Sequence, residues 1–303
     1  MILVTGGAGF IGSFVVDLLV DAGHEVRVVD VLHPGAHEHV PEYLHADADY
    51  RWGDLADPDV ARDAVRGIDA VCHQASMVGL GTDFADVSAY VHHNDVATAV
   101  LLGALHDHAF AGRVVLASSM VVYGEGAYRC AHHGVVRPAP RRAEDLARGE
   151  FDPTCPACSR SLMPVRISEN ALLEPRSVYA ATKLHQEHLC ACWGREHDTS
   201  VIALRYHNVY GPRMPADTPY SGVAAIFRSA LQRGLAPKVY EDGAQLRDFV
   251  HVEDIARANV LALEARGDVA GACNIASGEP HTILDLAEAL TNAVGEPTMP
   301  VIT

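Results

Sequence analysis

Tyr179 and Lys183 are the residues whose types and spacing best suit proton transfer. They stand four positions apart just after Ser177, where the sequence predicts the start of a helix, so the two side chains share one helix face. An ammonium group beside a phenol favours the phenolate and lowers the pKa of tyrosine from about 10. Tyr179 is therefore a candidate general base at neutral pH. Because Tyr-x-x-x-Lys matches are common on helix surfaces, the interpretation depends on the rest of the sequence.

Glycines at the start of the chain predict a site for a dinucleotide. Residues 1–5 are apolar or β-branched and predict a strand. The following turn and the start of the next helix contain Gly6, Gly9, Phe10, Ile11 and Gly12. Glycines lack a Cβ atom and so let a pyrophosphate approach the amide groups at a helix N-terminus. The alternative interpretation is an ordinary turn between a strand and a helix.

The second expected strand, residues 25–30, ends at Asp30. An acid about 20 residues beyond such a glycine loop typically binds the adenosine ribose. The next three residues are valine, leucine and histidine, so no arginine follows Asp30 directly to bind the 2′-phosphate of NADP. The pattern therefore predicts NAD rather than NADP as the cofactor.

Composition limits the classes of function. The chain has 303 residues, 49% of them apolar, which suits a globular protein of one or two domains. A net charge of −16 argues against nucleic-acid binding. No apolar run approaches the roughly 20 residues that cross a bilayer, so we expect no membrane span and a cytoplasmic location. Seven cysteines, an odd number, fit reduced thiols or metal ligands better than a disulfide framework.

Apolar strands alternate with helices up to residue 206, which predicts a Rossmann-type α/β fold with a doubly wound parallel sheet. Further strands are expected at 50–55, 68–76 and 113–119, and long helices at 87–108 and 177–197. Ligands bind at the carboxyl ends of parallel strands. Residues at or just beyond these ends are Asp30, Asp54, Leu55, Ala75, Ser76 and Ser119. Asp54 has an equally good alternative role as the cap of a helix over residues 58–66.

Residues 125–174, called the insertion below, interrupt this alternation and show little periodicity. They contain two pairs with the spacing of metal ligands, namely Cys130-x-x-His133 and Cys155-Pro-x-Cys158. Three thiolates and one imidazole suit a tetrahedral zinc ion, and a site closed by four protein ligands would be structural rather than catalytic. His132 could replace His133. The alternative is a solvated loop with incidental cysteines.

Three further blocks complete the pattern. They are Ala-Ser-Ser-Met-Val-Val-Tyr-Gly at 117–124, Leu-Arg-Tyr-His-Asn-Val-Tyr-Gly-Pro at 204–212, and the segment 240–254 around Arg247. With the glycine loop and Tyr-x-x-x-Lys, they resemble the NAD-dependent epimerase/dehydratase family of extended short-chain dehydrogenases/reductases, in order over nearly the whole chain. The insertion and residues 78–81 look most like nucleotide-sugar 4-epimerases acting on UDP-glucose, UDP-glucuronate or dTDP-L-rhamnose.

The resemblance assigns roles to particular residues. Ser119 would hydrogen-bond the reacting sugar hydroxyl, Tyr179 would act as the base, and Lys183 would be its partner. Asn208 and Arg247 would bind the diphosphate of a nucleotide sugar. The residues expected to bind NAD are Gly6, Gly9, Phe10, Ile11, Gly12, Asp30, Asp54, Leu55, Ala75, Ser76, Asn94, Tyr179, Lys183 and Tyr206.

The activity that the resemblance implies is inversion at C4 of a UDP- or dTDP-hexose through a transient 4-keto sugar. The 4,6-dehydratases of the family carry Asp and Glu where this chain has Met120 and Val121, and these side chains exchange no proton. Dehydration is therefore not expected. Decarboxylation of UDP-glucuronate stays open, because it proceeds through the same 4-keto sugar. A non-catalytic NAD-binding regulator is the alternative from another class.

The resemblance also implies an organisation in two parts. An NAD-binding domain is expected at residues 1–206, interrupted by the insertion and rejoined by residues 251–277. A smaller substrate-binding domain is expected at 207–303, incomplete at its C-terminal end because family members usually continue for some tens of residues. The helices at 87–108 and 177–197 have apolar positions beyond those that one face needs, and the resemblance implies that they pair in a homodimer.

Overall fold

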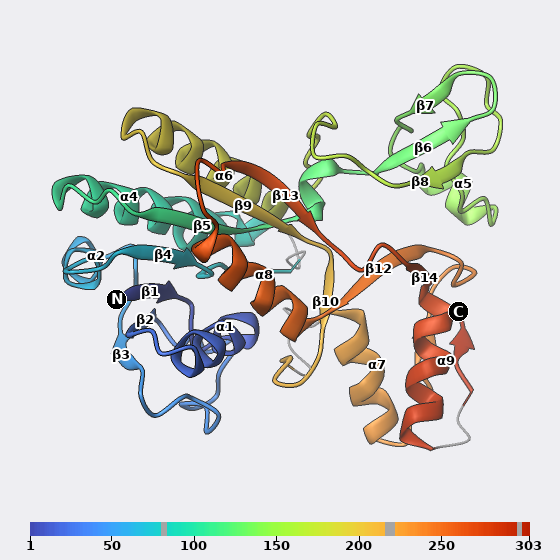
Figure 1. Ribbon diagram of the computed structural model, residues 1–303. Helices are drawn as coiled ribbons and strands as arrows, with labels where there is room; N and C mark the ends of the chain where they lie inside the picture. Colours follow the sequence, from blue (N-terminus) through green and yellow to red (C-terminus); the bar gives the residue numbers. More distant parts are fainter. Residues whose placement is uncertain (80–83, 216–221, 296–298) are drawn as a thin grey trace.

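A seven-stranded parallel sheet forms the centre of the protein, seen in a computed structural model that describes residues 1–79, 84–215, 222–295 and 299–303 (Figure 1). Leu80 and Gly81, part of the resemblance above, lie outside the described residues. The strand order is β13-β9-β5-β4-β1-β2-β3, and every neighbouring pair is parallel. The strands are β1 (Ile2–Thr5), β2 (Val26–Asp30), β3 (Asp49–Trp52), β4 (Ala70–His73), β5 (Arg113–Ser119), β9 (Val201–Tyr206) and β13 (Gly271–Ile275).

Helices cover both faces of this sheet, so the prediction of a doubly wound α/β fold is confirmed (Figure 1). On one face, α1 (Phe10–Asp21) and α8 (Val252–Glu264) bury Val15, Leu19 and Ile255 against the strands. On the other face lie α2 (Pro58–Ala64), α4 (Ala97–Asp107) and α6 (Val178–Glu196). The central strands are buried on both sides, which explains their nearly continuous apolar sequence.

The long helix expected at 87–108 is interrupted by a wider turn. It consists of α3 (Val87–Tyr90), the π-helix η2 (Val91–Val96) and α4, and the 3₁₀ turn η1 (Phe84–Asp86) precedes it. A π turn holds more residues than an α turn, so side chains on either side of it are rotated relative to a regular helix. The fully buried Asn94 lies within this turn.

A second layer of elements follows β9. The strands β10 (Asn208–Tyr210), β12 (Leu246–His251) and β14 (Pro280–Thr282) form a three-stranded sheet. The helices α7 (Val223–Gln232) and α9 (Ile283–Val294) pack around Phe227, Val239 and Ala287, beside the paired strands β11 (Lys238–Val239) and β15 (Val301–Ile302). Within the described ranges, no helix is long and apolar enough to cross a membrane.

The insertion has regular structure that the sequence did not predict. After the 3₁₀ turn η3 (Met120–Tyr123), the strands β6 (Ala127–Cys130), β7 (Gly134–Val136) and β8 (Met163–Val165) form a small antiparallel sheet, and α5 (Ala143–Ala147) lies between β7 and β8 in sequence. Each strand has only three or four residues, which is too short for an alternation of apolar and polar residues to be read. The sequence pattern therefore gave no sign of this sheet.

A chain of buried hydrogen bonds links the sheet to the helices beside it. His73 Nδ1 lies 2.6 Å from the Thr5 hydroxyl, and His73 Nε2 lies 2.9 Å from the Thr98 hydroxyl. Burial, with the nearby Lys183, lowers the pKa of His73 from its usual 6.5 to about 3. The imidazole is therefore neutral in the folded protein, whereas it binds a proton in the unfolded chain below pH 6.5.

We expect His73 to make the fold sensitive to acid. Its contribution to stability is complete above pH 6.5 and is lost as the pH falls towards 3, at about 1.4 kcal/mol per pH unit. Urea unfolding at pH 7, 6 and 5 should show that His73→Gln loses about 2 kcal/mol less stability than the unmodified protein between pH 6.5 and pH 5. Equal pH slopes for the two proteins would contradict a buried neutral His73.

Candidate active site

The turn after β1 has no room for side chains. Gly6 has a φ of +68°, and a Cβ atom there would lie 2.7 Å from the backbone nitrogen of Ala75. A Cβ atom on Gly12 would collide with the Gly6 carbonyl group. Gly9 precedes the first turn of α1, whose N–H groups receive no side-chain cap. These features are what a pyrophosphate at a helix N-terminus requires, so the loop fits a dinucleotide.

Asp30 is held at the carboxyl end of β2 by backbone donors. Its Oδ2 accepts a hydrogen bond of 3.0 Å from Ala8 N, and its Oδ1 accepts one of 2.8 Å from Leu32 N. The side chain is 9% exposed and lines the pocket next to the glycine loop. This is the position that the ribose-binding acid of a dinucleotide site occupies.

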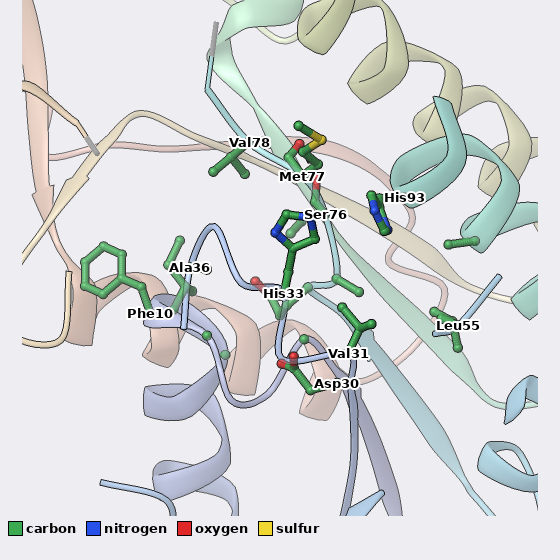
Figure 2. A pocket seen from close by; sticks show the side chains of 18 of the residues that line it. Phe10, Asp30, Val31, His33, Ala36, Leu55, Ser76, Met77, Val78 and His93 are labelled. Carbon is green, nitrogen blue, oxygen red and sulfur yellow. Dashed lines mark hydrogen bonds between the residues drawn. The ribbon is translucent and has the colours of Figure 1, made fainter. Parts of the chain in front are cut away.

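One pocket brings together most of the residues expected to bind NAD, as the close view in Figure 2 shows in part. Its lining includes Gly6, Gly9, Phe10, Ile11, Gly12, Asp30, Asp54, Leu55, Ala75, Ser76, Tyr179, Lys183 and Tyr206. Four expected site residues are outside its lining, namely Asn94, Ser119, Asn208 and Arg247. The residues that line it come from segments far apart in the sequence and meet at the carboxyl ends of β1, β2, β4 and β5.

Asn94 lies behind the pocket. Its Oδ1 accepts hydrogen bonds from Met77 N at 2.7 Å and from the Ser76 hydroxyl at 3.0 Å. Its Nδ2 donates to Met77 O and to the Thr182 hydroxyl. All of these bonds are within the protein, so the structure favours a positioning role for Asn94 over direct contact with a cofactor.

Histidines that the sequence analysis did not select also line the pocket. His33, His37 and His93 are part of its lining, and the rings of His33 and His93 meet edge to face at 5.2 Å (Figure 2). Burial lowers the pKa of His37 and of His93. No local spacing could have revealed this group, because His93 comes from the π turn and the others from the irregular segment after β2.

Asp54 does not cap a helix. Asp57 is the N-cap of α2 and accepts from Asp59 N, which excludes the capping role considered for Asp54. Asp54 Oδ2 instead lies 2.8 Å from His92 Nε2, and Asp54 Oδ1 accepts a hydrogen bond from Ala56 N. It remains part of the pocket lining together with Leu55.

Tyr179 and Lys183 lie in the first two turns of α6, which begins at the N-cap Ser177. The side chain of Ser119 acts to lower the pKa of the Tyr179 phenol, and its hydroxyl accepts a hydrogen bond from Val121 N. Burial has the larger effect and raises the pKa of Tyr179 to about 12. The net shift of this pKa is therefore upward, the reverse of the lowering expected, since the low-polarity surroundings disfavour the phenolate.

Lys183 is itself 3% exposed, and burial lowers its pKa to about 7. Its Nζ donates a hydrogen bond of 2.9 Å to Ala117 O, at the end of β5. The lysine is thus fixed between the sheet and the pocket, one helical turn from Tyr179. A group whose pKa lies near neutrality in a pocket is typical of a catalytic site.

A buried ion pair fixes α6 against the sheet. Arg205 on β9 donates to both carboxylate oxygens of Glu187 on α6, at 2.9 and 2.7 Å. The same guanidinium donates to the Tyr123 hydroxyl at 2.8 Å, and Tyr123 donates to Asn274 Oδ1 at 2.7 Å. The sequence analysis did not select these residues, because only the fold brings them together.

Asn208 and Arg247 carry polar groups without a full set of partners. The Oδ1 atom of Asn208 is buried and has no hydrogen-bond partner in the described part of the chain. Arg247 donates to Leu246 O, and no ion pair of Arg247 occurs within residues 1–79, 84–215, 222–295 and 299–303. Both residues lie in the β10-β12-β14 sheet. The guanidinium of Arg247 is suited to bind an anion, whereas the unpartnered Oδ1 of Asn208 is an acceptor that needs a donor.

The four expected metal ligands come together in the insertion. Cys130, His133, Cys155 and Cys158 each offer a ligand atom, and these atoms all lie within 4.8 Å of one another. His133 Nδ1 lies 3.5 Å from the sulfur atoms of Cys130 and Cys155, and the Cys130 and Cys158 sulfurs are 3.7 Å apart. His132 is not part of this group; it lies next to Arg160 instead.

Comparison with known proteins agrees with this geometry. The sequence matches the NAD-dependent epimerase/dehydratase family over residues 2–276. It is 35% identical to a dTDP-L-rhamnose 4-epimerase of Burkholderia thailandensis, over 98% of this chain and 82% of the relative. It is 29% identical to a UDP-glucose 4-epimerase of Streptomyces lividans, over 97% of this chain and 81% of the relative.

Solved structures of nucleotide-sugar 4-epimerases also match this chain. A UDP-N-acetylglucosamine 4-epimerase of Methanobrevibacter ruminantium, in complex with UDP-N-acetylmuramic acid, matches with a TM-score of 0.79 and 29% identity, over 100% of this chain and 84% of the other. A UDP-glucose 4-epimerase of Thermus thermophilus, in complex with NAD, matches with a TM-score of 0.72 and 30% identity, over 100% and 85%. By sequence and by fold, this chain belongs to the NAD-dependent epimerase/dehydratase family.

Proposed function

We propose that this protein is a nucleotide-sugar 4-epimerase that inverts C4 of a UDP- or dTDP-hexose with tightly bound NAD. The observation that carries the proposal is the group of Ser119, Tyr179 and Lys183 beside a pocket that begins at a glycine loop and Asp30. The names of the relatives support the same activity. All three reactive residues are present, which favours an enzyme over a non-catalytic regulator.

The residues that line the pocket would hold the cofactor. Gly6, Gly9 and Gly12 would accept the pyrophosphate, Asp30 the adenosine ribose, and Asp54 and Leu55 would lie at the adenine. When bound, NAD supplies reversible hydride transfer at the sugar C4 and a positive charge that favours the Tyr179 phenolate. Lys183 and Tyr206 line the same pocket.

Tyr179 would take the proton of the C4 hydroxyl and return it after the sugar has turned over. Ser119, whose side chain acts to lower the pKa of Tyr179, would orient the same hydroxyl. Burial raises the pKa of Tyr179 to about 12, so positive charge from its neighbours is needed before the phenol can act as a base near neutrality. Lys183, one turn away and held by Ala117 O, is placed to contribute that charge.

Asn208 and Arg247 would bind the diphosphate of the substrate. The guanidinium of Arg247 supplies a local attraction for an anion in a chain with a net charge of −16, and the side-chain NH2 group of Asn208 would donate to it. After Ser119 the chain carries Met120 and Val121, which offer no carboxyl group for the proton transfers of dehydration. These residues favour an epimerase over a 4,6-dehydratase.

We also infer that the chain forms two domains and that two copies of it form a homodimer. Residues 1–206 with 251–277 would form the NAD-binding domain, and the remainder of residues 207–303 would form the substrate-binding domain. The helices α4 and α6 lie side by side on one face of the sheet (Figure 1). Val91 and Val96, in the turn before α4, are 38% and 40% exposed, and a second copy of the chain would cover them.

The insertion would hold one structural zinc ion through Cys130, His133, Cys155 and Cys158. A tetrahedral zinc with Zn–S bonds of about 2.3 Å and Zn–N bonds of about 2.1 Å separates its sulfur ligands by about 3.8 Å and sulfur from nitrogen by about 3.6 Å. The observed 3.7 and 3.5 Å agree with these separations. A backbone hydrogen bond from His132 is the main effect that lowers the pKa of the Cys130 thiol to about 6.

The role of Tyr179 as the base is tested by the substitution Tyr179→Phe, which removes only the phenolic hydroxyl group. We expect turnover to fall by roughly 100- to 10,000-fold, the usual contribution of a general acid–base group. NAD released on denaturation should remain stoichiometric, because the glycine loop and Asp30 are untouched. Undiminished turnover in this variant would remove Tyr179 as the base.

The reaction is tested by a panel of UDP-glucose, UDP-galactose, UDP-glucuronate and dTDP-L-rhamnose, with products identified by NMR. Inversion at C4 of any member is the expected result and identifies the sugar. Loss of carbon dioxide from the glucuronate would place the enzyme among the decarboxylases. No reaction of any member in protein that carries NAD would favour the regulator.

The metal is tested by elemental analysis of protein purified without added metal. We expect about one zinc per chain, and its loss in Cys155→Ser/Cys158→Ser. Cys192→Ser is the matched control, because Cys192 is exposed and lies outside the ligand group. Absence of zinc from the unmodified protein would mean that the insertion folds without a metal ion.

A further inference from the structure

Arg213 contacts two aromatic rings that come from distant parts of the chain. It stands just after β10, and its Cζ atom lies 4.3 Å from the centre of the Phe14 ring, on α1. The same atom lies 4.7 Å from the centre of the Tyr43 ring, in the segment between β2 and β3. Both distances are those of cation–π contacts. The guanidinium therefore joins three segments of the chain.

Polar contacts with α1 fix the same guanidinium. Its Nη1 atom donates hydrogen bonds of 2.7 Å to Asp17 Oδ2 and of 3.1 Å to the Ser13 hydroxyl. Ser13 is buried, and the side chains of Arg213 and Asp17 are 22% and 23% exposed. Solvent and salt screen a partly buried ion pair less than an exposed one. Arg213 is thus anchored to the helix that begins at the glycine loop.

The backbone of Arg213 is also unusual. Its φ is +64°, in the left-handed region that residues with a side chain rarely adopt. A residue stays in this region only where its surroundings hold it there, and such residues are frequent at ligand clamps. The contacts of Arg213 with α1 and with Tyr43 supply these surroundings.

Tyr43 belongs to residues 31–48, called the strap below, which connect β2 to β3. The Tyr43 hydroxyl donates a hydrogen bond of 2.9 Å to Ala8 O, inside the glycine loop. Ala8 N in turn donates to Asp30 Oδ2. Tyr43 therefore joins the strap to the loop expected to bind the pyrophosphate and, through Ala8, to the acid expected to bind the ribose.

The strap also forms part of the pocket wall. His33, Ala36 and His37 line the same pocket as the glycine loop and Asp30, and Figure 2 shows His33 and Ala36 among the lining residues. A dinucleotide that fills this pocket would touch both the strap and the glycine loop. Contacts that fasten the strap to the glycine loop and α1 would therefore slow its release.

We propose that Arg213 retains the dinucleotide, because it fastens the strap to α1 through Tyr43 and Asp17. Arg213 is a positioning residue, since it lies outside the lining of the pocket and acts through its neighbours. The ligand is NAD, so the inference rests on the proposed function. Arg213 also follows β10, the strand that carries Asn208, and so joins the segment expected to bind the nucleotide sugar to the cofactor loop.

The test is the rate at which the purified, NAD-containing enzyme exchanges its cofactor for isotopically labelled NAD. We expect Arg213→Gln to exchange roughly 10-fold faster, the effect of losing partly desolvated cation–π contacts. Arg213→Lys keeps a charge for Asp17 but lacks the planar group that packs on the rings, so its rate should be intermediate. Tyr43→Phe keeps the ring and loses the bond to Ala8 O, and it should exchange roughly 2- to 10-fold faster.

Arg257→Gln is the matched control. Arg257 is exposed on α8 and pairs with Asp254 and Glu253 of its own helix, so removal of its charge should leave the exchange rate unchanged. The Tm of each variant is measured beside its exchange rate. Equal exchange rates in Arg213→Gln and the unmodified enzyme would overturn the inference, and a lower Tm without faster exchange would assign Arg213 to fold stability alone.

The exchange rate is measured without turnover, so the inference and the proposed activity can fail separately. Faster exchange in Arg213→Gln, in a protein that converts no sugar of the panel, would support the inference and contradict the epimerase activity. Turnover of a sugar together with unchanged exchange would do the reverse. An unmodified protein that binds no NAD would overturn both.

Discussion

The buried ion pair between Arg205 and Glu187 fixes the helix α6 against the central sheet. A pair with so little exposure is maintained only if each charge keeps its partner, and removal of one partner typically costs about 3–5 kcal/mol. Through this pair the helix that carries Tyr179 is fixed to β9, next to β5 and the loop that follows it. The hydrogen bonds from Arg205 to Tyr123 and from Tyr123 to Asn274 extend the constraint to β13. The pocket is therefore built on a buried charged centre whose pairing with Glu187 the sequence does not reveal.

The features that the sequence predicted correctly are local ones. Gly6 and Gly12 are required by contacts within a few residues or with the adjoining strand, and Asp30 is placed by the end of its own strand. Tyr179 and Lys183 share a helix face because of helix geometry alone. The four metal ligands could likewise be proposed from the sequence, because they form two pairs with short spacings.

The features that the sequence did not predict depend on tertiary surroundings. The pKa of Tyr179 is set mainly by burial, which spacing to Lys183 cannot reveal. In the π turn, the Asn94 side chain makes its hydrogen bonds within the protein, whereas the neighbouring His93 lines the pocket. The sheet of the insertion is formed by strands too short to show a period, and its small core is built on Cys130, Cys155 and Leu162.

The guanidinium of Arg247 has a kinetic consequence. At the site proposed for the diphosphate, an anionic ligand is repelled at long range by the net charge of −16 and attracted at short range by this guanidinium. Physiological salt screens charges beyond about 8 Å, so it suppresses the long-range repulsion more than the short-range attraction. Capture of the ligand should therefore be faster in moderate salt than at low ionic strength, the reverse of the behaviour of enzymes that steer their substrates electrostatically.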